Sequence, residues 1–228
     1  MKLLIDSANL EEIKSIYEYY PVDGVTTNPS ILLKEKKKPY ELLKEIRSFI
    51  GKDAELHVQV ISLDADEMVT EGHKIQEVLG KNTYVKIPVT PEGLKAISVL
   101  AKEGANVTAT AVYNQMQAFL AGKSGAKYVA PYVNRIDNLG YNGILVTKQI
   151  QDILDGSGFA TEILAASFKN SHQILELCEY GVGASTAGPD IIAGLIKSET
   201  ISQAVLAFKD DFEQLCGKDS TMLTCEEK

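Results

Sequence analysis

The sequence predicts an α/β protein that folds as a single (β/α)8 TIM barrel with one extra helix at its C-terminus. Short apolar segments and helical segments alternate about eight times along the 228 residues of the chain. The apolar segments are continuous, as in the strands of a parallel sheet that is covered on both faces. A doubly wound open sheet is the alternative, but no GxGxxG follows the first apolar segment.

The predicted strands are short and follow one another at regular intervals. They cover residues 3–5, 24–26, 57–61, 84–87, 106–112, 128–131, 163–166 and 182–185, and the last has the weakest pattern. Asn9 with Glu12 forms a capping-box pattern that predicts a helix after the first strand. Asn28 and Thr90, each followed by proline, open two further helices. Other helical patterns cover residues 65–80 and begin near residue 189.

The chain is expected to form one domain, since it contains no linker, low-complexity tract or internal repeat. A helical apolar pattern at residues 200–215 predicts the extra C-terminal helix, which can pack on its own barrel or on a neighbour. We therefore assign residues 1–216 to the barrel with this helix. Residues 217–228 form a polar tail that we expect to be loose.

The composition is that of an ordinary globular protein, with 45% hydrophobic and 24% charged residues. A net charge of −8 argues against nucleic acid as a general partner. No apolar run approaches the roughly 20 residues of a membrane span, and the N-terminal apolar stretch is too short for a signal peptide. Cys178, Cys216 and Cys225 form no CxxC and no framework, so we expect a reducing cytoplasm.

Polar side chains recur at or near the carboxyl end of seven predicted strands. In barrels of this kind the active site lies at that end. These residues are Asp6, Thr26, Thr27, Asn28, Gln59, Lys86, Thr108, Thr110, Tyr132, Asn134, Arg135, Ser167 and Lys169. Packing alone does not account for so many polar groups, several of them ionisable, and we expect them to form one site.

Lys86 lies inside the apolar segment 84–88. On its own it is explained as an edge lysine or a snorkelling one. Together with Asp6, Gln59 and Tyr132 on other strands, it indicates a buried amine at a site, because lysines are almost never buried unpaired. Desolvation lowers the proton affinity of such an amine, which can then form an imine with a ketone and stabilise a carbanion at the adjacent carbon.

Two further groups of polar residues allow more than one interpretation. Asp6 either caps the first helix or is a buried carboxylate that handles a proton or holds a substrate hydroxyl. Arg135, Ser167 and Lys169 indicate an anion site, because arginine matches the geometry of a phosphate or sulfonate. A surface ion pair between Arg135 and Asp137 is the alternative.

Four segments of the chain resemble the transaldolase family. They are DGVTTNPS at 23–30, VKIPVTPEG at 85–93, YVAPYVNRID at 128–137 and LAASFK at 164–169. Four long motifs in order, in a resemblance that runs from Leu4 to about residue 215, are far more specific than one short pattern. The short chain resembles the small bacterial subfamily, which includes fructose-6-phosphate aldolases and small transaldolases.

The resemblance implies a role for each matching residue. Lys86 would be the Schiff-base lysine. Asp6 and Asn28 would hold donor hydroxyls, with Asp6 also handling protons. The remaining catalytic positions, which would orient a water or act with it as general acid and base, are Thr110, Gln59 and Tyr132. The remaining substrate-binding positions are Thr26, together with Arg135, Ser167 and Lys169 for the sugar phosphate.

The resemblance also implies the partners of the protein. Similar proteins are barrels that assemble as pentamers or decamers through swapped C-terminal helices, so we expect a homo-oligomer. The expected ligands are small phosphosugars, and neither a cofactor nor a metal is expected. His57, His73 and His172 show no ligand cluster, which disfavours a metal-dependent aldolase.

The resemblance favours a class I aldolase that cleaves or forms fructose 6-phosphate from dihydroxyacetone and glyceraldehyde 3-phosphate. Gln59 is the main reason, because the similar aldolases have glutamine here and the transaldolases generally have glutamate. The alternatives are a transaldolase that passes the dihydroxyacetone unit between phosphosugars, the same chemistry on sulfonated sugars, and a barrel that binds a phosphosugar without turnover.

Two positions depart from the resembled pattern. His57 shares a strand face with Gln59, where similar aldolases tend to have an apolar side chain. It is either a hydrogen-bonded group behind the site or a residue that alters proton transfer. Residues 185–189, STAGP, replace a more apolar run and leave the contacts made by the eighth loop open.

Overall fold

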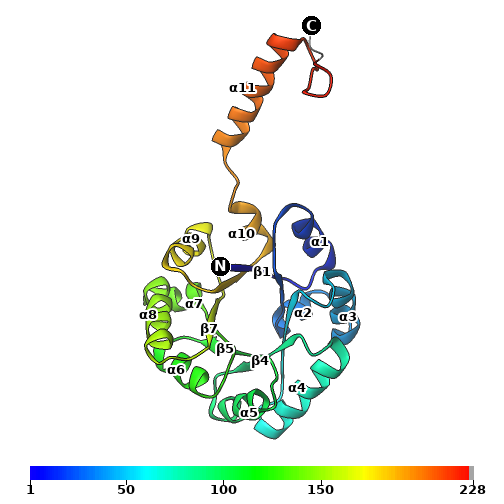
Figure 1. Ribbon diagram of the computed structural model, residues 1–228. Helices are drawn as coiled ribbons and strands as arrows, with labels where there is room; N and C mark the ends of the chain where they lie inside the picture. Colours follow the sequence, from blue (N-terminus) through cyan, green and yellow to red (C-terminus); the bar gives the residue numbers. More distant parts are fainter. Residues whose placement is uncertain (226–228) are drawn as a thin grey trace. The chain divides into compact units, whose positions relative to one another are not determined.

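The computed structural model describes residues 1–225 and divides the chain into two compact units, Met1–Ile192 and Ala193–Lys228. The first unit contains a closed barrel of eight parallel strands in the order β1 to β8. Helices surround this ring of strands on the outside (Figure 1). The predicted (β/α)8 TIM barrel with an added C-terminal helix is confirmed, and the open sheet is wrong.

The eight strands of the structure lie close to the predicted segments. Their bounds are Lys2–Asp6 (β1), Gly24–Thr26 (β2), Glu55–Gln59 (β3), Thr83–Pro88 (β4), Val107–Val112 (β5), Tyr128–Pro131 (β6), Glu162–Ala165 (β7) and Ala184–Ala187 (β8). The predicted β3 began too late because Glu55 is charged, yet it is buried in an ion pair with Lys2. The predicted β8 ended too early because its buried residues include Ser185 and Thr186, which carry little apolar signal.

Ten helices of the described residues begin in the first unit, and the last of them extends into the second. They are Leu10–Tyr19 (α1), Pro29–Lys34 (α2), Pro39–Ile50 (α3), Ala65–Leu79 (α4), Pro91–Lys102 (α5), Gln115–Lys123 (α6), Val133–Asn138 (α7), Gly143–Gly156 (α8), Ser171–Tyr180 (α9) and Pro189–Gly194 (α10).

Asparagine or threonine caps the first turn of α1, α2 and α5. Asn28 and Thr90 cap α2 and α5, as expected. Asn9 caps α1 by accepting hydrogen bonds from the backbone of Glu11 and Glu12. The side chain of Glu12, however, accepts a hydrogen bond from Ser7 Oγ, so it does not make the predicted capping box. Because Asn9 is the cap of α1, the alternative of Asp6 as the cap is wrong.

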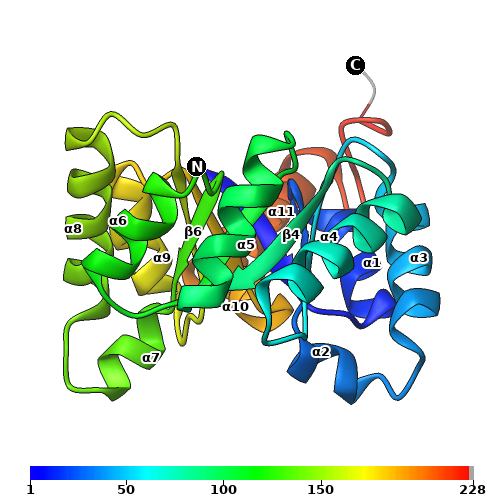
Figure 2. The same cartoon turned by 90° about the horizontal axis from the view of Figure 1, so that it is seen from below.

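The predicted polar residues lie at the end of the barrel formed by the carboxyl ends of the strands. Figure 2 shows α2 and α7, which directly follow β2 and β6, at one end of the barrel, and the N-terminus at the other. Between these ends an apolar cluster fills the interior, made of Leu4, Tyr84, Tyr128, Leu164 and Ala184. This packed layer places any cavity for a ligand at the carboxyl ends of the strands, as barrels of this kind do.

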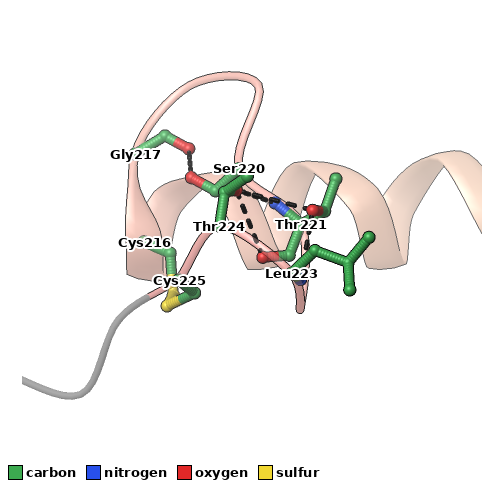
Figure 3. Close-up of a disulfide and its surroundings, with 7 residues drawn as sticks. All are labelled: Cys216, Gly217, Ser220, Thr221, Leu223, Thr224 and Cys225. Atoms are coloured by element: carbon green, nitrogen blue, oxygen red, sulfur yellow. Dashed lines mark hydrogen bonds between the residues drawn. A yellow bond between two sulfur atoms is a disulfide. The ribbon is translucent and has the colours of Figure 1, made fainter.

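The second unit contains α11 (Glu199–Cys216), which matches the helix predicted at 200–215. The chain turns back after Gly217, whose φ of 100° suits glycine, and Cys216 forms a disulfide with Cys225 (Figure 3). The prediction that the cysteines form no disulfide framework is wrong for this pair, because the turn brings their Cα atoms to 5.8 Å. The division into residues 1–216 and a tail of 217–228 stays a prediction.

None of the helices within residues 1–225 is both long enough and apolar enough to cross a membrane.

Candidate active site

A cavity of about 160 Å³ lies at the carboxyl ends of the barrel strands. It is lined by Asp6, Asn28, Lys86, Thr110, Ala130, Tyr132, Arg135, Leu164, Ala166, Ser167 and Thr186. The structure therefore brings together seven of the residues that the sequence predicted for the site. These are Asp6, Asn28, Lys86, Thr110, Tyr132, Arg135 and Ser167.

Lys86 lies in the middle of β4 with only 6% of its surface exposed. Its Nζ donates a hydrogen bond of 2.9 Å to the backbone carbonyl of Thr27. Burial lowers the pKa of Lys86 below its usual value, and the negative charge of Asp6 opposes this shift. The wall of the cavity therefore carries an amine with reduced proton affinity.

Asp6 is held by Thr26, which in turn contacts a second threonine, Thr186. Its Oδ1 accepts a hydrogen bond of 2.7 Å from Thr26 Oγ1. Thr26 Oγ1 is in turn 2.7 Å from Thr186 Oγ1. Thr26 is fully buried and does not line the cavity, whereas Thr186 does. The substrate contact expected of Thr26 stays a prediction, and its side chain contacts Asp6 and Thr186 in the structure.

Thr110 and Tyr132 share a hydrogen bond of 2.8 Å across β5 and the end of β6. The pairing of these strands shifts between Ala109 and Val112, and Ala111 there has a φ of 58°. An extra residue in one strand redirects its side chains locally. Such bulges commonly adjoin active sites, and this one adjoins the contact between Thr110 and Tyr132.

Arg135 lies on α7, one turn after Tyr132. The centre of its guanidinium is 4.7 Å from the centroid of the Tyr132 ring. A hydrogen bond with Tyr113 raises the pKa of Arg135, so the side chain stays charged. Asp137 is occupied elsewhere, because its carboxylate accepts hydrogen bonds from the backbone of Gly143 and from the Gln173 side chain. Its hydrogen bonds thus give no support to the alternative of an ion pair with Arg135.

Ser167 follows β7 and has a φ of 62°, which is uncommon for a residue other than glycine. Its carbonyl accepts a hydrogen bond of 2.7 Å from the backbone of Asn134 on α7. This bond ties the β7 loop to the helix that carries Arg135. Strained backbone of this kind is concentrated at functional sites, where the surrounding structure maintains it.

Gln59 and Lys169 are predicted site residues that do not line this cavity. Gln59 is paired with Lys86 in the strand register, but it lines two neighbouring cavities of about 640 and 770 Å³. The backbone of Lys169 donates a hydrogen bond to Gln173, and its side chain is outside the cavity lining. The roles of both residues stay predictions.

His57 is fully buried below the site. Its Nδ1 is 2.9 Å from Thr108 Oγ1, and its Nε2 is 3.2 Å from Glu55 Oε2. Its ring stacks on Tyr84 with centroids 4.3 Å apart. Burial lowers the pKa of His57 to about 4, against the opposing effect of Glu55. Both ring nitrogens therefore have partners, as expected for a hydrogen-bonded group behind the site.

Four residues of the cavity wall were missed from the sequence. They are Ala130, Leu164, Ala166 and Thr186. The first three are apolar and carry no chemical signal. Thr186 was inside the segment that departs from the resembled pattern, and the predicted end of the eighth strand at residue 185 excluded it.

The chain was compared with known proteins. A family model described as Transaldolase/Fructose-6-phosphate aldolase matches residues 3–226. A probable fructose-6-phosphate aldolase of Streptococcus pneumoniae is 41% identical over 93% of this chain and 96% of its own length. A probable transaldolase of Thermodesulfovibrio yellowstonii is 38% identical over 94% of this chain and 99% of its own. A probable transaldolase of Methanococcus maripaludis is 37% identical over 93% and 98%, respectively.

The barrel, its buried lysine and these matches define an enzyme of the aldolase or transaldolase class. The chain belongs to the Transaldolase/Fructose-6-phosphate aldolase family. Its relatives carry both names, so the family alone leaves the choice between the two activities open.

Proposed function

We propose that the protein is a Schiff-base aldolase that cleaves or forms fructose 6-phosphate, with Lys86 as the amine. The observation that carries this proposal is a buried lysine of lowered pKa in a polar cavity at the strand ends. Binding a phosphosugar without turnover has no need of such an amine, and family membership adds independent support.

The reaction begins with attack of Lys86 Nζ on the ketone carbon of the sugar. Loss of water gives a protonated imine, which withdraws electrons from the neighbouring carbon. Removal of the proton from the hydroxyl of the fourth carbon then breaks the bond to the third carbon. Glyceraldehyde 3-phosphate leaves, and the three-carbon enamine on Lys86 is protonated and hydrolysed to dihydroxyacetone.

The other residues of the cavity bind the sugar hydroxyls, transfer protons and orient water. Asp6 holds a donor hydroxyl and takes part in proton transfer. Asn28 uses Oδ1 to cap α2, which leaves its Nδ2 to donate to a second hydroxyl. Thr110 and Tyr132, which bond to each other, orient a water near the reacting carbons. Gln59 is the strand neighbour of Lys86 and is expected to assist them, although it lines other cavities in this structure. Neither metal nor cofactor enters this sequence of steps.

The phosphate of the sugar is bound at the side of the cavity formed by α7 and the β7 loop. Arg135 supplies a charged guanidinium that suits bidentate contact with phosphate. Ser167 adds a hydroxyl, and Lys169 just beyond it adds a second positive charge. A sulfonated sugar fits the same chemistry, and assaying it beside the phosphate measures which anion the site prefers.

Schiff-base formation is tested by borohydride reduction in the presence of dihydroxyacetone. The reduced adduct is expected on Lys86 by peptide mass spectrometry, and Lys86→Met is expected to abolish it. Lys95→Met, which removes an exposed lysine of α5, is the matched control and should label normally. Full labelling of the Lys86 variant would exclude this lysine, and absence of any adduct would favour a barrel that only binds sugars.

A transaldolase is the second candidate. The presence of glutamine, a neutral side chain, at position 59 favours the aldolase over the transaldolase. A neutral amide orients water without adding a negative charge, which favours hydrolysis and release of the three-carbon unit. We expect fructose 6-phosphate alone to yield glyceraldehyde 3-phosphate. If this product forms only when erythrose 4-phosphate is added, the enzyme is a transaldolase.

We also propose that the protein is a homo-oligomer, a pentamer or decamer, held together through α11. The helix has no buried residue and exposes Ile201, Val205, Leu206, Phe208 and Leu215. Apolar side chains gathered on one helix favour association. Native mass spectrometry should show smaller species for Phe208→Asp, whereas Gln203→Asp on the same helix should keep the assembly. An unchanged assembly in the Phe208 variant would contradict this role of α11.

A further inference from the structure

Three side chains from β1, β2 and β8 form a short hydrogen-bonded row in which Asp6 and Thr186 line the cavity and Thr26 lies between them, outside its lining. Thr186 Oγ1 lies 2.7 Å from Thr26 Oγ1, which lies 2.7 Å from Asp6 Oδ1. Thr26 is 0% exposed and Thr186 is 2% exposed. Both bonds therefore lie in the barrel interior, where hydrogen bonds are stronger than in water.

The chemistry of the three groups sets the direction of the row. An ionised carboxylate only accepts hydrogen bonds, so the hydrogen of Thr26 Oγ1 points to Asp6. Thr26 has no second hydroxyl hydrogen for Thr186. The hydrogen between the two threonines is consequently that of Thr186, which donates to Thr26.

The strand register explains how residues so far apart in sequence meet. Asp6 is paired with Thr26 between β1 and β2, and Leu4 is paired with Thr186 between β1 and β8. The row thus crosses the seam at which the last strand closes the barrel onto the first. The barrel closure, and not a local turn, fixes the separation of Thr186 from Asp6.

We propose that Thr186 is a positioning residue for Asp6, acting through the hydroxyl of Thr26. The row occupies Oδ1 of the carboxylate and leaves Oδ2 as the oxygen that faces the substrate. A threonine is suited to this task, because its branched side chain has few rotamers and keeps the hydroxyl in one direction. The inference rests on the proposed function, since it concerns how Asp6 serves the chemistry at Lys86.

The row also influences the electrostatics of the site. A donor hydrogen-bonded to a carboxylate stabilises its charged form, and a row of hydroxyls polarises in the same direction. When Thr186 no longer donates, Thr26 becomes a weaker donor to Asp6. The carboxylate of Asp6 is then less firmly oriented.

The test compares Thr186→Val, which removes the hydroxyl and keeps the shape, with Thr186→Ser, which retains the hydroxyl. We expect the valine variant to lose about 10-fold in kcat with KM changed less than about 2-fold, because misplacement of a catalytic group acts on the chemical step. Its kcat–pH profile should also differ from that of the wild type. Thr186→Ser should recover most of the activity and the original profile.

Ser185→Ala is the matched control on the same strand. Its Oγ contacts the sulfur of Met1 and is absent from the cavity, so kcat and the profile should stay as in the wild type. A second signature is coupling. If Thr186 acts through Thr26, a Thr26→Val/Thr186→Val double variant should lose no more activity than Thr26→Val alone.

Three results would overturn the inference. They are a wild-type kcat and pH profile in Thr186→Val, equal impairment of the valine and serine variants, or additive losses in the double variant. Should Thr186→Val not fold by circular dichroism, Thr186→Ala replaces it and is judged by the same outcomes. The borohydride adduct is measured in parallel. A wild-type enzyme without an adduct at Lys86 refutes the proposed function, whereas a normal adduct with an unaffected valine variant refutes only the role of Thr186.

Discussion

At the scale of single residues, Lys86 shows how burial changes the chemistry of a side chain. An exposed lysine is almost entirely protonated at neutral pH and is a poor nucleophile. Burial in β4 disfavours the charged form of Lys86, while the nearby carboxylate of Asp6 favours it. The two effects oppose each other, so Asp6 determines how much of the burial effect survives.

The pH at which Lys86 reacts should therefore depend on Asp6. Only the neutral amine attacks a carbonyl, so the rate of adduct trapping should rise with pH and level off below the usual lysine pKa. Asp6→Asn removes the charge that raises the pKa of Lys86, and the plateau should then begin at a lower pH. The measurement is the initial rate of borohydride trapping across pH.

Asp53→Asn, in an exposed loop before β3, serves as the control for this measurement. Its trapping profile should coincide with that of the wild type. A plateau that stays in place or moves to higher pH in Asp6→Asn would show that Asp6 does not act on Lys86 through charge.

At the scale of elements, the junction between β4 and α5 positions Lys86. Thr90 Oγ1 accepts a hydrogen bond of 3.0 Å from the backbone of Gly93, which starts the helix directly after the strand. A Cβ at position 93 would overlap the carbonyl oxygen of Pro88, the last residue of β4. Glycine is thus required for the helix to begin so close to the strand that carries the amine.

Gly93→Ala is expected to destabilise the protein and to reduce its activity. The carbonyl of Pro88 must move to make room, and overpacking of this kind costs about 1–3 kcal/mol. Because the displaced strand carries Lys86, kcat should fall more than the loss of folded protein explains. Urea denaturation and steady-state kinetics on the same preparation measure the two effects.

Gly156→Ala at the end of α8 is the comparison for this substitution. A Cβ there meets nothing within 4 Å, so the variant should be as stable as the wild type or slightly more stable. Equal stability and activity of the two alanine variants would mean that the close approach at Gly93 is not required.

At the scale of the whole barrel, a group of polar side chains lies at the end away from the cavity, with Glu55 and His57 buried and Lys2 partly exposed. Lys2 pairs with Glu55 at 2.6 Å, and Glu55 also approaches His57, Tyr84 and Tyr128. Burial raises the pKa of Glu55, but hydrogen bonds from His57 and Lys2 outweigh this and lower it to about 2. This group joins β1, β3, β4 and β6 and links folding of the barrel to pH.

The unfolding free energy should fall as the pH is lowered through the range of His57. The histidine binds a proton near pH 6.5 when unfolded but only near pH 4 when folded, so acid favours the unfolded chain. The contribution of His57 to the unfolding free energy is fully present above pH 6.5. Its loss between pH 6.5 and about pH 4 is on the order of 3 kcal/mol. Glu55 extends the loss from about pH 4.5 to about pH 2, because its folded pKa is also depressed.

Urea denaturation at several pH values measures this dependence. His57→Leu should flatten the slope between pH 6.5 and about 4, even though the variant is less stable at neutral pH. His73→Leu, which removes an exposed histidine of α4, should retain the wild-type slope. A steep slope that persists in the His57 variant would assign the acid sensitivity to other groups.

The sequence by itself determined the barrel class, the order of its strands and most of the residues at their ends. These properties depend on local patterns: the length of each apolar run, the caps such as Asn28 and Thr90, and the polar residue that ends each strand. A lysine within such a run is visible without any structure, and so Lys86 was identified as the reactive candidate.

Only the tertiary structure decided which of these residues meet. Gln59 and Lys169 carry the expected chemistry but lie outside the cavity, Thr26 lies behind it, and Thr186 is part of its wall. The disulfide between Cys216 and Cys225 likewise required the turn that follows α11. The physical reason is that the register between β8 and β1, the pair that closes the barrel, determines which side chains become neighbours there. The residue spacing within either strand alone does not determine that register.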